Sequence, residues 1–207
     1  AIKNGDYQTA ITALYYEMAE NPSKKELRDT LAAVYFAIRA FPQCLTVVTE
    51  LLQERPNDQR LLEVSALCLQ AFGSLEGLKR SLEQYEKLYG LSKSSYHLYQ
   101  IATLQYNLKR SGECGLSVEQ LLKSPDIDKE KVSITAGQNQ TQEVSMRAAV
   151  LNIRGVLLME AKNIEGAKQN FKEALKLEPN FILAKGNLEL AEKPAGAKPG
   201  TGTATGK

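Results

Sequence analysis

Apolar residues recur at spacings of three and four through most of the chain, and this spacing is typical of amphipathic helices. The segment that starts near Lys25 and ends at Pro56 has its apolar positions at Leu31, Ala32, Tyr35, Cys44, Val48 and Leu51. The next segment has the corresponding positions at Leu62, Ala66, Leu69, Leu78, Leu82 and Tyr85. We therefore expect pairs of antiparallel helices that pack along a shared apolar stripe.

Residues that end helices recur with a fixed period. The interval from Pro22 in AENP to Pro56 in QERP equals the interval from Pro56 to Gly90 in KLYG. We expect Gly90 to stop a helix in the place of a proline. This interval matches the period of the tetratricopeptide repeat, which is about 34 residues.

The clearest copy of this repeat is AAVLNIRGVLLMEAKNIEGAKQNFKEALKLEP. Its pattern residues are Leu151, Gly155, Leu158, Ala167, Phe171, Ala174 and Pro179. Gly155 and Ala167 are small, which allows two helices to approach closely, and Phe171 fills the space beside them. The segment resembles a tetratricopeptide repeat, and the other copies are similar to it in spacing.

The resemblance covers residues 1–193 and implies an all-α fold, an α-solenoid of tetratricopeptide helical hairpins wound as a right-handed superhelix. We expect this repeat domain to comprise a partial copy at 1–24, copies at about 25–58, 59–92, 95–128 and 148–181, and a capping helix at 182–193. The remaining residues, 194–207, consist mostly of Gly, Pro, Ala, Thr and Lys. Such a tail buries too little apolar surface to fold, so we expect it to be disordered.

One segment departs from the repeat. In KVSITAGQNQTQEVSM, Val132 and Ile134 alternate with polar residues before a turn, and Val144 and Met146 alternate after it. Alternation on both sides of a turn containing Gly and Asn predicts a β-hairpin at about 131–146, and an irregular loop is the alternative. Insertions in repeat arrays project from one face and often belong to the binding surface.

Composition argues against several classes of function. The chain is 43% hydrophobic and 24% charged, with a net charge of +2. Its basic residues form no stripe of the kind that binds nucleic acid. No run approaches the roughly 18 apolar residues of a membrane span. The three cysteines are isolated and lie in apolar helical patterns, so we expect them to pack as small hydrophobes. The single histidine, His97, gives no metal cluster, and we expect neither catalysis nor a cofactor.

The resemblance also implies a concave groove lined by the first helix of each pair. Polar and aromatic residues at spacings of three and four form one stripe in the copy near Ser95: Tyr96, Tyr99, Gln100, Thr103, Tyr106 and Asn107. Tyrosine gives large, rigid contact area, which favours a recognition surface. Packing of these tyrosines between adjacent copies, with hydroxyls at the rim, is an equal alternative. By position in the family, the matching residues elsewhere are Glu26, Asp29, Thr30, Arg60, Glu63, Asn152, Val156 and Met159.

Some family members hold the terminal carboxylate of a peptide with a clamp of lysine, arginine and asparagine. The matching places here hold Asp29, Ala33, Val64, Tyr96 and Gln100, so we expect no such clamp.

The sequence therefore predicts a scaffold that binds a protein or peptide, with homo-oligomers possible. The alternatives are a self-associating spacer in a cell-envelope assembly and the docking part of a longer polypeptide. The sequence as a whole is similar in character to those of bacterial tetratricopeptide proteins that are exported to the envelope. We expect the periplasm or cell envelope, with the cytoplasm as the alternative. The start at Ala1, without methionine, is compatible with a removed signal peptide or with trimming.

Overall fold

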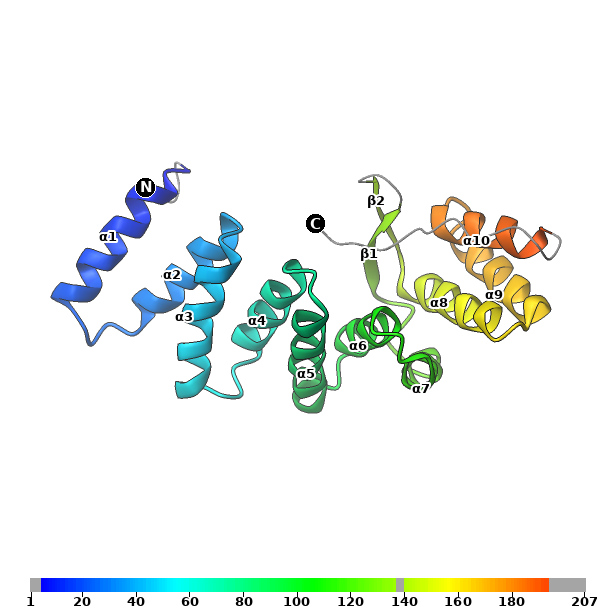
Figure 1. Cartoon of the computed structure of the whole chain (residues 1–207), viewed down its shortest axis with the longest axis horizontal. Helices are drawn as coiled ribbons and strands as arrows, with labels where there is room; N and C mark the ends of the chain where they lie inside the picture. Colours follow the sequence, from blue (N-terminus) through cyan, green and yellow to red (C-terminus); the bar gives the residue numbers. More distant parts are fainter. Residues whose placement is uncertain (1–4, 137–139, 194–207) are drawn as a thin grey trace. The chain divides into compact units, whose positions relative to one another are not determined.

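The computed structural model describes residues 5–136 and 140–193, in which helices follow one another as packed pairs (Figure 1). The helices are α1 (Tyr7–Glu20), α2 (Glu26–Ala37), α3 (Phe41–Glu54), α4 (Gln59–Ala71), α5 (Leu75–Ser92), α6 (Ser95–Asn107), α7 (Ser111–Leu122), α8 (Met146–Glu160), α9 (Ile164–Leu177) and α10 (Ile182–Glu192). Two strands, β1 (Lys131–Ala136) and β2 (Gln140–Ser145), lie between α7 and α8. The predicted class of helical hairpins with a small β-hairpin is confirmed, whereas the right-handed superhelix stays a prediction.

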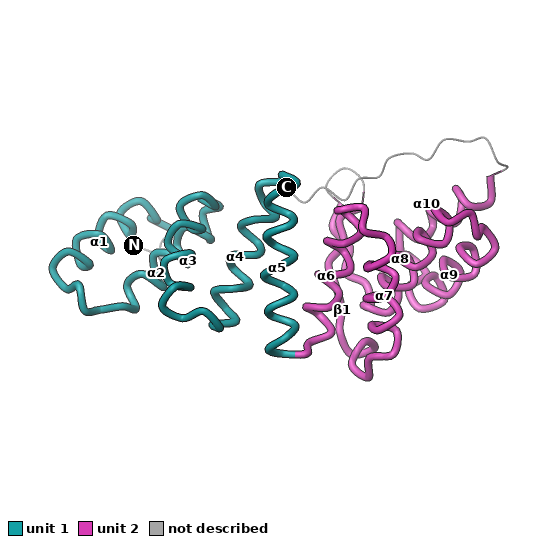
Figure 2. The backbone as a smooth tube through the Cα atoms, turned by 60° about the horizontal axis from the view of Figure 1, so that its bottom comes forward, with its two compact units in different colours: residues 1–92 teal, residues 93–207 magenta. Residues whose placement is uncertain are grey.

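Some expectations fall on residues outside the described ranges. They concern the tail at 194–207, residues 1–4 of the partial copy, and residues 137–139 in the hairpin turn. The chain divides into two compact units, unit 1 (residues 1–92) and unit 2 (residues 93–207), which Figure 2 colours separately. The extent of a single repeat domain over 1–193 stays a prediction.

An apolar cluster packs α1 to α4 of unit 1 together. Its buried members are Ile11, Leu31, Ala32, Val34, Tyr35, Cys44, Val48, Leu51, Leu61 and Cys68. They come from α1 to α4 at the spacing of three and four that the sequence shows. Burying one such large side chain stabilises the fold by about 1.5–3 kcal/mol. A hydrogen bond of 3.0 Å between the hydroxyls of Tyr15 and Tyr35 also joins α1 to α2.

The turn inside each helical pair shows the repeat in backbone geometry. Arg39, Gly73, Lys109 and Lys162 have φ angles of 58°, 62°, 60° and 64°. Each follows the predicted start of its copy by the same interval, and Arg39 and Gly73 are as far apart in sequence as Pro22 and Pro56. The left-handed conformation favours glycine. Three of the four copies nevertheless place a long basic residue there, so the turn geometry is set by the helix packing.

Close packing inside the pairs depends on small residues, as predicted for Gly155 and Ala167. A Cβ on Gly155 would lie 2.4 Å from Cε1 of the buried Phe171. In two other copies a cysteine takes the place of Ala167, and the thiols of Cys44 and Cys114 donate to the carbonyl oxygens of Ala32 and Ala102 at 3.4 and 3.2 Å. All three cysteines are free and buried, in agreement with the predicted apolar packing.

Two details of the second copy were predicted wrongly. Leu78, expected as an apolar position of the repeat, is only half-buried, and its neighbour Gly77 is buried. A Cβ added to Gly77 would lie 2.5 Å from the Leu69 carbonyl oxygen. Gly90 does not stop the helix, because α5 continues to Ser92. Glycine lacks the ring that prevents proline from continuing a helix, so a glycine at this position does not force an end.

The β-hairpin is antiparallel, with Val132 opposite Val144 and Ser133 opposite Glu143. Val132 and Val144 are buried, so one face of the hairpin packs on the helices. The amide of Gln142 donates to the Asn180 carbonyl at 2.7 Å and accepts from Ile182 N–H at 3.0 Å. These bonds fix β2 to the turn between α9 and α10. An isolated hairpin is marginal in water, so this anchorage explains its persistence.

Candidate functional site

The predicted tyrosine stripe lies on α6 in unit 2, and its members differ in burial. Tyr99 is only 7% exposed, and burial raises its pKa to about 12. Tyr96, Gln100, Thr103, Tyr106 and Asn107 are all half-buried. The burial of Tyr99 supports the packing alternative for that residue. The half-buried members remain accessible in part.

Tyr106 has defined polar and charged neighbours. Its hydroxyl donates to Glu160 Oε1 at 3.2 Å, which links α6 to the end of α8. The Lys109 ammonium lies 5.3 Å from the centre of its ring, within the range of a cation–π contact. Burial, and then the charge of Glu160, raise the pKa of Tyr106 to about 12. Its hydroxyl therefore stays protonated at neutral pH and donates within the protein.

The corresponding positions on α8 are covered by the last helix. Asn152 is 7% exposed, and its side-chain oxygen accepts a hydrogen bond of 2.9 Å from Asn187 on α10. Val156 and Met159 pack against the cluster that contains Phe171. In the last pair, α10 therefore covers the position of Asn152 on the first helix. Sequence spacing alone gives no signal of this covering.

Unit 1 contains a hollow of about 380 Å³ on the first-helix positions. Its lining comes from α2, from the first turn of α1 and from the first turn of α4: Tyr7, Asp29, Thr30, Ala33, Val34, Ala37 and Arg60. Asp29, Thr30 and Arg60 were predicted from the family position. Tyr7, Val34 and Ala37 were missed, and Ala33 was considered only as a clamp position. Glu63 is half-buried on α4 and is not a lining residue.

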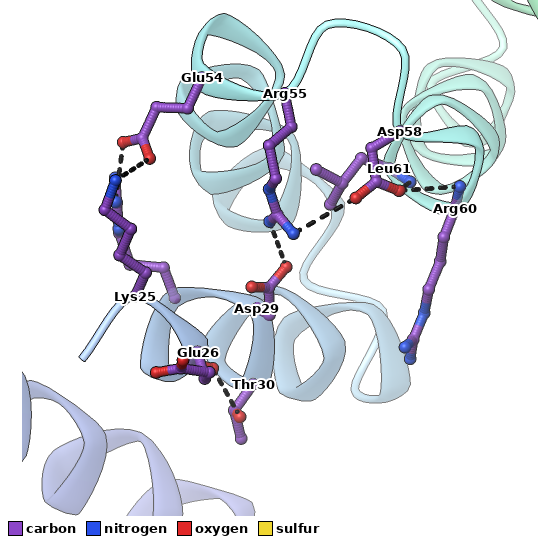
Figure 3. A network of polar contacts seen from close by, with 10 residues as sticks. Lys25, Glu26, Asp29, Thr30, Glu54, Arg55, Asp58, Arg60 and Leu61 are labelled. Carbon is purple, nitrogen blue, oxygen red and sulfur yellow. Dashed lines mark hydrogen bonds and ion pairs between the residues drawn. The ribbon is translucent and has the colours of Figure 1, made fainter.

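A polar network holds the wall of this hollow in place (Figure 3). Arg55, just after α3, pairs with Asp29 on α2 at 2.5 Å and with Asp58 at 3.3 Å. Asp58 in turn accepts hydrogen bonds from the N–H groups of Arg60 and Leu61, which caps α4. The network therefore joins α2, the end of α3 and the start of α4.

The charged side chains around the hollow differ in whether they form ion pairs. Arg28 and Lys25 both pair with Glu54, at 2.7 and 3.5 Å, and the bond from Arg28 lowers the pKa of Glu54. The Arg60 side chain extends away from Asp58 in Figure 3, and no ion pair joins its guanidinium to another residue of the described chain. The hollow thus combines a neutralised carboxylate, a floor of small apolar side chains and an available cation.

Unit 2 contains a second and larger hollow, of about 600 Å³, between α7 and α8. Gly112, Gly115 and Val118 line one side, and Leu157 and Leu158 line the other. An ion pair of 3.0 Å between Arg154 and Glu119 crosses it. This hollow lies away from the positions that the family resemblance indicates.

A family model for the tetratricopeptide repeat matches residues 148–181. The structure is similar to those of known tetratricopeptide proteins. The chain has the tetratricopeptide-repeat fold. The match covers the repeat formed by α8 and α9, and the preceding pairs share its backbone turn and its close helix packing.

Three solved structures illustrate the similarity of this repeat fold. The MamA protein shares 12% identity at a TM-score of 0.63, over 80% of this chain and 79% of that chain. TTC0263, a thermophilic TPR protein in Thermus thermophilus, shares 14% identity at a TM-score of 0.53, over 92% of each chain. YrrB, described as a TPR protein with an unusual peptide-binding site, shares 12% identity at a TM-score of 0.59, over 86% of this chain and 81% of that chain. No curated protein matches the chain.

The described residues carry no group of three or more His, Cys, Asp or Glu that could hold a metal ion. Among these residues, no helix has both the length and the apolar character that crossing a membrane requires.

Proposed function

We propose that this chain is a scaffold that binds a protein or peptide segment, and that the hollow of unit 1 is its main recognition surface. The observation that carries the proposal is the lining of this hollow. Asp29, Ala33 and Ala37 of α2 and Arg60 of α4 face one space of about 380 Å³. Structural neighbours with this fold include a protein described as having a peptide-binding site.

The chemistry of the hollow suits an extended segment with one apolar side chain. Ala33 and Ala37 are exposed and small, so an apolar side chain of a ligand can displace water from them. Arg60 offers five N–H donors to carbonyl or carboxylate oxygens of the same segment. Asp29 is already held by Arg55, which reduces its repulsion of an acidic ligand. Sites of this kind combine an apolar floor with few polar groups that fix orientation.

The half-buried members of the α6 stripe form a second proposed contact surface within unit 2. These are Tyr96, Gln100, Thr103, Tyr106 and Asn107. Tyr99 and Asn152 are left out of this surface because both are buried. Glu63 is half-buried outside the hollow and is also left out.

The experiment starts from peptides selected out of a random displayed library on the immobilised full chain. Calorimetry then compares the best peptide on the native chain and on Ala33→Arg, which fills the hollow from an exposed helix position. We expect Ala33→Arg to weaken binding by about tenfold or more, a loss of about 1.4 kcal/mol. The matched control is Gln53→Arg, at an exposed position of α3 outside the hollow. It should bind like the native chain.

Two results would contradict this proposal. One is equal affinity of Ala33→Arg and Gln53→Arg for the selected peptide, with both variants as helical as the native chain. The other is failure to select any peptide that binds above background.

The alternative of a self-associating spacer is supported by a separate observation, the open outer edge of β1. The predicted location in a bacterial envelope stays a prediction.

A further inference from the structure

The two outer edges of the β-hairpin differ in what lies along them. On the β2 side, the Ser145 N–H donates to Glu178 Oε1 at 2.9 Å, and Gln142 bonds Asn180 and Ile182. Residues 178–182, between α9 and α10, therefore lie along the β2 edge. An added strand could not approach there without displacing this turn.

The pairing register shows which backbone groups of β1 point outward. Met146 N–H donates to the Glu130 carbonyl at 2.9 Å, which continues the strand ladder by one pair. Hydrogen-bonded and non-hydrogen-bonded pairs alternate along an antiparallel ladder. The pairs of Val132, Ile134 and Ala136 are then the bonded ones. The N–H and C=O groups of Lys131, Ser133 and Thr135 consequently point away from β2.

The alternation also explains why the N–H of Ser145 bonds outside the strand pair. This residue is opposite Lys131, so its N–H points outward from β2, and it is indeed bound to Glu178. On β1, no backbone or side-chain hydrogen bond to another described residue uses the N–H or C=O of Lys131, Ser133 or Thr135. Ser133 and Lys131 are exposed. An exposed row of unpaired donors and acceptors is a template for strand addition.

We propose that this open edge of β1 pairs with β1 of a second copy, which forms a four-stranded antiparallel sheet across a two-fold axis. A register centred on Ser133 places Ser133 opposite its own copy and Lys131 opposite Thr135. All three outward residues then exchange bonds with outward residues of the partner strand. The same backbone groups of each copy therefore pair with those of the other, as a two-fold interface requires.

The side chains also fit this pairing. In the same register, Val132 lies opposite Ile134 on the face that packs on the helices, and such apolar pairs stabilise sheets. No like charges meet, because Lys131 faces a threonine. Lys131 itself is paired with Glu143 of its own hairpin at 3.4 Å. The edge therefore carries no uncompensated charge of the kind that usually prevents edge-to-edge association.

The test is sedimentation equilibrium of the full chain over a wide concentration range. We expect the mass to rise from 22.8 kDa for one chain toward twice that value. Ser133→Pro removes an outward N–H without touching the bonded pairs of the hairpin, and it should keep the chain monomeric. Thr141→Pro makes the same change at an outward position of β2 and keeps the Lys131–Glu143 ion pair, so it should associate like the native chain.

A second variant keeps the test decisive if proline disturbs the hairpin. Residues that form a hydrogen-bonded antiparallel pair have Cα atoms about 5.5 Å apart, which a disulfide can span. Under a mild thiol oxidant, Ser133→Cys should give a covalent dimer, and Thr141→Cys, at an outward position of β2, should not. Monomeric mass at all concentrations, equal association of Ser133→Pro and Thr141→Pro, or no dimer from Ser133→Cys would each overturn the proposal.

Discussion

At the scale of single residues, the small side chains of each helical pair decide how closely the two helices approach. Gly155 faces the ring of Phe171, and Gly77 faces the backbone of α4. Gly186 lies inside α10 with no atom near the position of a Cβ. The same substitution to alanine should thus have opposite effects at Gly155 and Gly186.

We expect Gly155→Ala to reduce the free energy of unfolding by about 1–3 kcal/mol, because the added Cβ would lie 2.4 Å from the ring of the fully buried Phe171. Gly186→Ala should instead raise it by about 0.5–1 kcal/mol, since alanine favours an exposed helix interior. Urea unfolding of both variants followed by circular dichroism measures this difference. Equal shifts of the same sign would show that Gly155 has no packing role.

At the scale of elements, the turn inside each helical pair is conformationally equivalent in four copies. Gly73 occupies it without strain, whereas Arg39, Lys109 and Lys162 adopt a conformation that costs L-residues roughly 1–2 kcal/mol. The packed pairs impose this geometry, and the sequence of the turn does not determine it.

Substitutions in this turn should therefore change the free energy of unfolding only through the strain of the backbone at a positive φ angle. Gly73→Ala should destabilise the chain by about 1–2 kcal/mol, because no atom lies near its Cβ and only the backbone conformation is strained. Lys162→Gly should be neutral or stabilise by up to about 1 kcal/mol, since relief of strain outweighs the added freedom of the unfolded chain. Thermal unfolding of the two variants tests this. A destabilised Lys162→Gly would mean that its side chain matters more than its backbone.

Sequence periodicity predicted the helical pairs and the hairpin because these patterns are local. The spacing of Leu31 and Tyr35, or of Val132 and Ile134, is a property of one short segment. The errors arose where packing between segments decides which residue is buried and where a helix ends. The burial of Gly77 instead of Leu78, and the uninterrupted helix at Gly90, depend on how α4 and α5 pack against each other.

The candidate site was predictable only in part for the same reason. Asp29, Thr30 and Arg60 follow from the position within the repeat, but Tyr7 joins the hollow from a different helix. Asn152 is on the predicted face yet is covered by α10 through Asn187. A single sequence shows which face a residue is on, and the neighbouring helix decides whether that face is open.

At the scale of the whole molecule, two surfaces within separate units suggest different associations. The hollow of unit 1 presents Arg60 and a small apolar floor, which suits a segment of another protein. The β1 edge of unit 2 presents unpaired backbone groups, which suits a second copy. Ser133→Pro should not change peptide affinity, and Ala33→Arg should not change the mass of the assembly, so the two proposals are tested independently.

The central claim is that the first-helix face of unit 1 binds a peptide segment. The most direct measurement is a titration of the isotope-labelled full chain with the selected peptide, followed by amide chemical shifts in nuclear magnetic resonance spectra. We predict saturable shifts concentrated at Thr30, Ala33 and Ala37 of α2 and at Arg60 of α4, which line the hollow. Saturable shifts elsewhere in the chain, with these four residues unchanged, would contradict it.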